Sequence, residues 1–189
     1  MREREYGRAP NSLSQTRPAG LDAFKKQRVD RGTDWRELPE ARGRTDDMSE
    51  FNGSELEFWL GTWDVSWGEH GRGTNRIERI LGDHVIHEQF DGRGETSQLV
   101  GQSWSVFDPE RHLWRQTWVD DQGGYLDLVG ELVDGWFSFG RDAPEDGASA
   151  RQRMVFRDVA ADGFHWVWEA SADGGATWES RWEIEYRRA

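Results

Sequence analysis

Apolar and polar residues alternate along most of the chain from residue 56 onward. The last segment shows the pattern most clearly, because Trp178, Ser180, Trp182, Ile184 and Tyr186 alternate with charged residues at every position between them. Successive side chains of an extended strand point to opposite faces, so a period of two is typical of a strand that is buried on one side. We therefore expect a strand with one buried face and one face in water.

Similar segments recur along the chain, with turn residues between them. Glycine supplies a positive φ and Asp bonds to its own backbone, so pairs such as Asp134-Gly135 and Asp162-Gly163 are typical of tight hairpins. The predicted strands are residues 56–67, 74–81, 84–90, 98–107, 113–119, 125–133, 136–139, 151–159, 164–170 and 178–186. The nearest candidate for a helix is a single turn around residues 53–57. This pattern predicts an all-β fold, a ten-stranded antiparallel up-and-down barrel, with a two-sheet sandwich as the alternative.

The first 47 residues differ from the rest. Their only aromatic residues are Tyr6, Phe24 and Trp35, and 11 Lys and Arg stand against 9 Asp and Glu. So few large apolar side chains cannot offset the entropy lost on ordering such a stretch. We predict a disordered arm over residues 1–47 and one β-barrel domain over residues 48–189.

Met48 gives this boundary a second interpretation. It stands directly before the domain, so we expect the natural protein to begin at Met48. The alternative is a genuine arm in which residues 21–29 form a short helix on a partner.

Composition limits the possible partners. Residues 48–189 carry 13 Arg, no Lys and 27 Asp and Glu, and such an acidic domain repels phosphate backbones, so no nucleic-acid partner is expected. The absence of cysteine excludes disulfides, a thiolate nucleophile and metal sites built on Cys. No apolar run of membrane-spanning length and no apolar N-terminal signal segment occurs, so we predict a soluble, cytoplasmic protein without a membrane partner. No feature of the sequence predicts the oligomeric state.

Tryptophan is unusually frequent in the predicted barrel. The chain has 12 tryptophans, and all except Trp35 lie in this region. In strand spacing the following share a face: Trp59, Trp63 and Trp67; Trp114 and Trp118; Trp166 and Trp168; Trp178 and Trp182. If these faces point inward, the indole rings either fill the core or form a flat aromatic pocket that stacks on a planar or hydrophobic ligand.

Polar residues in the inward phase are candidates to orient a ligand. Gln116 lies between Trp114 and Trp118 in strand phase, and a buried amide needs hydrogen-bond partners. We predict that Gln116 contacts the ligand; the alternative is a structural hydrogen bond to a neighbouring strand. The predicted ligand-binding residues are Gln116, Trp114, Trp118, Trp166, Trp168 and Trp182. A different possibility, an interior charge pair, is suggested by Arg79, Glu88 and Arg153.

Three short blocks resemble a known family. The segment Leu60-Gly61-Thr62-Trp63 resembles the Gly-x-Trp signature of the calycins, the lipocalin and fatty-acid-binding barrels. With Trp-Arg-Gln-Thr-Trp-Val-Asp at 114–120 and Asp-Gly-Gly-Ala-Thr-Trp-Glu at 173–179, the chain is similar to an uncharacterised bacterial family of calycin-like, lipocalin-like barrels, a domain of unknown function. The resemblance spans residues 56–188 and implies that Trp63 closes one end of a barrel. It implies no established activity.

Metal and haem sites are not expected. The five histidines include no pair spaced to place two imidazoles side by side on one strand, which a metal site would need. Nitrobindin barrels, which are calycin relatives, bind haem through a histidine near the end of the chain. The last strand here has none, and His165 lies one strand earlier, in phase with Val167 and Glu169. We therefore predict no metal and no cofactor.

Catalytic motifs are also missing. Neither a Gly-x-Ser-x-Gly elbow nor a phosphate-binding loop before a helix occurs, and no catalytic residue is predicted. The predicted function is the binding of a small hydrophobic or aromatic molecule inside the barrel. One alternative is an isomerase or cyclase that acts by confining its substrate. Another is a structural or protein-interaction module without a ligand.

Overall fold

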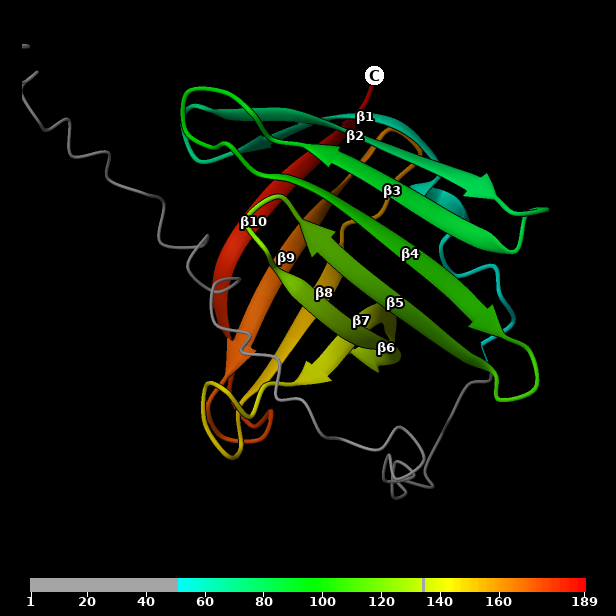
Figure 1. Cartoon of the computed structure of the whole chain (residues 1–189), viewed down its shortest axis with the longest axis vertical. Coiled ribbons are helices and arrows are strands. Elements are labelled where there is room, and N and C mark those ends of the chain that lie inside the picture. The colour runs from blue at the N-terminus through cyan, green and yellow to red at the C-terminus, as the bar shows by residue number, and fades with distance from the viewer. Residues whose placement is uncertain (1–50, 134) are drawn as a thin grey trace, which may run out of the picture.

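The chain folds into a single closed barrel. The structure, a computed structural model, describes residues 51–133 and 135–189. Ten strands pair in antiparallel fashion with their neighbours in the chain, and β1 also pairs with β10 to close the sheet (Figure 1). The strands are β1 (Gly61–Trp67), β2 (Gly71–Ile80), β3 (Val85–Asp91), β4 (Val100–Asp108), β5 (Leu113–Asp120), β6 (Tyr125–Val133), β7 (Trp136–Asp142), β8 (Arg151–Arg157), β9 (Gly163–Ser171) and β10 (Glu179–Arg188). The predicted all-β, ten-stranded barrel is confirmed, and the sandwich alternative is wrong.

Two sequence-based predictions concern residues that the structure does not describe. The arm over residues 1–47 and the start at Met48 both lie outside the described residues. Within residues 51–133 and 135–189, no helix has the length and apolar character needed to cross a membrane.

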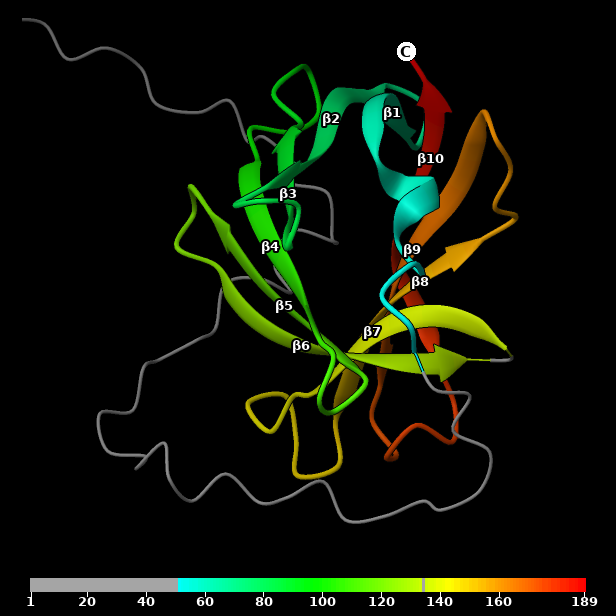
Figure 2. The same cartoon turned by 90° about the vertical axis from the view of Figure 1, so that its right-hand side faces the viewer.

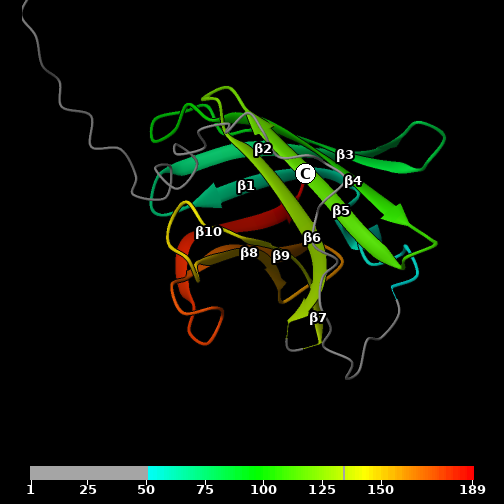
Figure 3. The same cartoon turned by 60° about the horizontal axis from the view of Figure 1, so that its bottom comes forward.

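Alternation of side chains produces the barrel interior. In β1, Trp63, Val65 and Trp67 are buried, whereas Thr62 and Asp64 in the alternate phase are exposed. This is the expected result of a strand with one face toward the core. Figure 3 shows how β6 and β7 join the β1–β5 side of the sheet to the β8–β10 side.

A short segment before β1 closes one end of the barrel. Residues 56–60 were expected to begin the first strand, but the structure places the 3₁₀ helix η3 (Glu57–Trp59) there. Leu56 and Trp59 are fully buried, and Figure 2 shows their segment, in cyan, crossing the barrel opening. Trp59 therefore does not share a strand face with Trp63 and Trp67. Its burial comes from plugging the barrel end.

Trp63 holds η3 against the barrel. The resemblance to the calycins implies that Trp63 closes one end of the barrel, and its position in the structure agrees. Its indole Nε1 donates a hydrogen bond to the Trp59 carbonyl oxygen at 2.8 Å. On the other side, the Arg188 guanidinium lies 3.8 Å from the centre of the Trp63 ring and donates to the Leu60 carbonyl oxygen at 2.6 Å. The last strand, the first strand and η3 thus meet at one indole.

One tryptophan pair is separated by a β-bulge. The pairing of β10 with β9 shifts register between Ser180 and Trp182. Trp182 points inward, but Trp178 lies ahead of β10 and packs under the Arg153 guanidinium, 3.8 Å from the ring centre, on the outer surface. The prediction that Trp178 and Trp182 share a face is wrong, because the bulge changes the phase of the strand.

Candidate functional site

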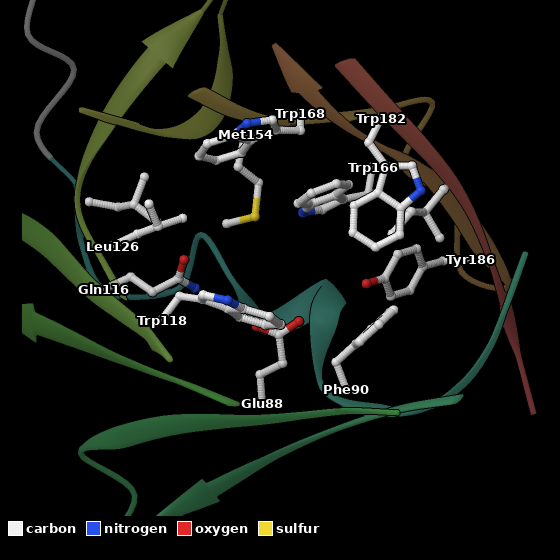
Figure 4. A pocket seen from close by; sticks show the side chains of 12 residues that line it. Glu88, Phe90, Gln116, Trp118, Leu126, Met154, Trp166, Trp168, Trp182 and Tyr186 are labelled. Atoms are coloured by element: carbon white, nitrogen blue, oxygen red, sulfur yellow. The ribbon is translucent and has the colours of Figure 1, made fainter. Parts of the chain in front are cut away.

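A cavity occupies the middle of the barrel and the end away from η3 (Figure 4). Its walls are almost wholly apolar, and among the described residues only Glu88 and Gln116 carry an amide or a carboxyl group into it. The aromatic lining consists of Phe90, Trp118, Trp166, Trp168, Trp182 and Tyr186. Leu126, Leu128, Met154 and Ile184 complete the wall.

The indole rings form two sides of a slot. The rings of Trp166 and Trp168 are nearly parallel, at 12° with centres 6.3 Å apart, and Trp182 stands at 81° to Trp166. Across the cavity, Phe90 contacts Trp118 at 6.3 Å between ring centres. The free cavity volume is only about 30 Å³. The free space is therefore narrow, with room for one or two water molecules.

Gly101 on β4 allows Trp118 to lie where it does. A Cβ atom at position 101 would stand 2.1 Å from Cζ2 of Trp118, which no real contact permits. The indole thus lies directly against the β4 backbone, and its Nε1 donates to Asp120 Oδ2 at 3.2 Å. Trp118 and Trp182 are only partly buried, so these two rings form the mouth of the cavity.

A buried carboxyl group is the main polar feature of the cavity. Glu88 is 5 % exposed, and Figure 4 shows its carboxyl group directed into the space between the rings. Asn75 Nδ2 donates to Glu88 Oε1 at 2.7 Å, and Ser103 Oγ donates to Oε2 at 2.6 Å. Asn75 Nδ2 also donates to the Tyr186 hydroxyl at 2.9 Å. Glu88 and Tyr186 are thus held by one shared amide.

Gln116 extends this network on the β4–β5 side. Its Nε2 donates to Ser105 Oγ at 3.0 Å and to Ser103 Oγ at 3.3 Å. Ser103 therefore connects Gln116 with Glu88. The alternative considered for Gln116, a structural hydrogen bond to a neighbouring strand, is therefore present, and the same side chain also lines the cavity.

Burial raises the pKa of both Glu88 and Tyr186. Removal from water raises the pKa of the Glu88 carboxyl above its ordinary value, although hydrogen bonds from Ser103 and Asn75 and the nearby charge of His87 act in the opposite direction. Burial and the negative charge of Glu88 hold the pKa of Tyr186 well above its usual range. Tyr186 is therefore a neutral hydroxyl that can still donate one hydrogen bond.

No cationic side chain in the described part of the chain pairs with Glu88. Arg79 forms its ion pair with Glu57. Arg153 pairs with Glu169 at 2.6 Å on the outer face, since the adjacent Met154 points inward. The interior charge pair suggested for Arg79, Glu88 and Arg153 does not form. Arg79 shares the inward phase of Asn75 and Ile77, but it lies near the end of β2 and pairs with Glu57 of η3, whereas Arg153 lies on the outer face.

Five of the six residues predicted to bind the ligand lie together. The cavity is lined by Gln116, Trp118, Trp166, Trp168 and Trp182. Trp114 lies nearer the closed end, where its Nε1 donates to Glu55 Oε2 at 2.7 Å and its ring contacts Phe137. It is part of the plug rather than of the cavity wall.

Sequence reasoning did not select Glu88 or Tyr186 for the site, although a signal for both is present. Glu88 stands between Ile86 and Phe90 in the inward phase of β3, so it is a carboxyl group on an otherwise apolar face. Tyr186 follows Ile184 in the inward phase of β10. A charged residue in the phase of buried neighbours is uncommon, and it marks a functional candidate.

The histidines do not contribute to the cavity. His165 is exposed on the outer face, with its Nδ1 3.2 Å from Asp158 Oδ2, so it is not placed to hold a haem inside the barrel. Across residues 51–133 and 135–189, no three His, Asp or Glu side chains gather as a metal site would require.

No known protein family matches the chain, and no curated protein is significantly similar to it.

Proposed function

We propose that this barrel binds a small hydrophobic or aromatic molecule in the cavity between Trp118, Trp166 and Trp182. The observation that carries the proposal is the lining itself: six aromatic side chains surround one narrow space, and Glu88, Gln116 and Tyr186 supply its few polar groups. Sites for small molecules are typically concave and apolar with a few placed polar groups. The carboxyl group of Glu88 and the hydroxyl group of Tyr186 reach the same space and can orient a ligand there.

The shape of the cavity favours a flat ligand that enters through the mouth. Because the free space is narrow, we propose that a ring-sized molecule enters when Trp118 and Trp182 turn aside, since both are partly exposed. Trp166 and Trp168 are buried and stay as a fixed wall. Side-chain movements of this kind are common on binding.

The three sequence blocks and the closed barrel together also support our placing the chain among the uncharacterised calycin-like barrels.

Neighbouring positions on β6 provide a test. Leu128 lines the cavity, whereas Val129, the next residue, lies on the outer face and is 39 % exposed. We expect ethylbenzene to bind and to quench tryptophan fluorescence. Leu128→Phe should lower the affinity of the protein for ethylbenzene at least about tenfold, because the larger side chain fills the cavity. Isothermal titration calorimetry measures the affinity.

Val129→Phe is the matched control because it introduces the same phenyl side chain outside the barrel. Its affinity for ethylbenzene should equal that of the unmodified protein. Equal affinities in both variants, or no binding in the unmodified protein, would contradict a ligand site in the cavity.

A further inference from the structure

We infer that the ligand carries a cationic nitrogen, an ammonium group on a hydrophobic or aromatic body, and that this group pairs with Glu88. This inference rests on the proposed function, since it names the chemistry of a ligand in the same cavity. It follows from the partners of Glu88, from the rings around it and from the charge of the domain.

No cationic side chain among the described residues bonds to the Glu88 carboxyl group. Its two carboxyl oxygens accept hydrogen bonds from neutral donors only, Asn75 at 2.7 Å and Ser103 at 2.6 Å. Among the described residues no arginine or histidine forms an ion pair with it, and His87, its neighbour in the chain, points outward and stacks on Trp104. Buried carboxylates are usually paired, so a bound cation would supply what the protein does not.

The unused hydrogen-bonding capacity of Glu88 also favours a ligand that donates hydrogen bonds. Each oxygen of an ionised carboxylate can accept about two hydrogen bonds, and each oxygen of Glu88 accepts one from the protein. An ammonium group is a donor only and would use this remaining capacity. A carboxylate or phosphate at the same place would be repelled by Glu88.

The aromatic walls of the cavity also favour a positively charged ligand. The faces of indole rings carry negative electrostatic potential and attract ammonium groups, more strongly where water is excluded. Trp118, Trp166 and Trp182 line the cavity that the Glu88 carboxyl group enters. A ring system with one carboxylate therefore suits an organic cation better than a neutral hydrocarbon.

The charge of the domain would help such a ligand to arrive. Residues 48–189 carry 27 acidic residues against 13 arginines. A strongly negative field raises the local concentration of cations and their association rate, and salt weakens the effect.

Ligands of matched shape separate the possibilities. Benzylamine, in its protonated form, ethylbenzene and benzyl alcohol differ at one heavy atom, which is an ammonium, a methyl or a hydroxyl group. At pH 8 we expect benzylammonium to bind at least about tenfold more tightly than benzyl alcohol or ethylbenzene in calorimetric titrations. Glu88→Gln should weaken benzylammonium binding roughly 10–100-fold and weaken ethylbenzene binding much less.

Glu183→Gln is the matched control. It removes one exposed carboxylate from the outer face of β10 and so tests the effect of losing one negative charge outside the cavity.

Retained ethylbenzene binding shows that Glu88→Gln folds. If Glu88→Gln does not fold, the test is made on the unmodified protein by measuring its affinities at several pH values. The affinity for benzylammonium should rise as Glu88 ionises, while the affinity for ethylbenzene stays constant. The groups that face Glu88 from neighbouring strands are Asn75, Ser103 and Tyr186, of which only Tyr186 titrates.

The outcomes distinguish the two proposals. Equal affinity for all three ligands, a preference for benzyl alcohol, or a preference for benzylammonium that survives Glu88→Gln would overturn the cation while the cavity site stands. A failure of all three to bind would overturn the proposed function and the cation with it.

Discussion

Replacing Trp63 with alanine should lower the free energy of unfolding by about 3–5 kcal/mol. The side chain is fully buried and holds η3 through the Trp59 carbonyl oxygen, while the Arg188 guanidinium covers its other face. The substitution removes this packing, leaves a void at the closed end and exposes the plug. Small domains have only about 5–15 kcal/mol of stability, so this is a large fraction. Urea unfolding followed by circular dichroism measures it.

Trp136→Ala is the control for this substitution. Trp136 is 51 % exposed on β7, so its removal should change the free energy of unfolding by less than about 1 kcal/mol. If both variants unfold at the same urea concentration, Trp63 does not fasten the barrel end.

Stability should fall as the pH rises above about 4.5, because of Glu88. Burial raises the pKa of the folded-state carboxyl above its ordinary value of 4.5. Between these two pKa values the folded protein keeps a proton that the unfolded chain has released, so raising the pH favours unfolding. The decline is up to about 1.4 kcal/mol per pH unit and ends when Glu88 is ionised in the folded state. Glu88→Gln should lack this decline.

The measurement is the difference in unfolding free energy between the unmodified protein and Glu88→Gln, from pH 5 to pH 8. Other titrating groups are shared by the two proteins, so their effects largely cancel. Acidic groups with lowered pKa act in a different window: hydrogen bonds from Arg93 lower the pKa of Asp91 to about 2, so its contribution is lost only below its ordinary range. A difference that is constant with pH would show that Glu88 ionises as it does in the unfolded chain.

The strands could be predicted from the sequence because burial on one face leaves a period of two. Turn chemistry then separated the strands, and ten short strands joined by tight hairpins favoured closure. Residues 56–60 were misread because Leu56, Trp59 and Leu60 are as apolar as a buried strand. Their burial at a barrel end leaves no periodic signature that distinguishes a 3₁₀ turn from a strand.

The site could be predicted in part, because strand phase gives the face of a residue but not its depth along the barrel axis. Gln116 and Trp118 lie in the cavity and Trp114 lies near the plug, although all three share one face of β5. The bulge between Ser180 and Trp182 cannot be seen in the alternation either, since it inserts a residue without changing residue types. The network that holds Glu88 joins β2, β3, β4 and β10, and such long-range contacts appear only in the folded barrel.

A crystal structure with 4-bromobenzylamine tests the central claim most directly, because bromine is located by its anomalous scattering. We expect one bromine inside the barrel among Trp118, Trp166 and Trp182, with the amine nitrogen within hydrogen-bonding distance of the Glu88 carboxyl group. The same crystals of Leu128→Phe should show no bromine there. Bromine found only on the outer surface, with the rings of the cavity undisturbed, would contradict a binding site inside this barrel.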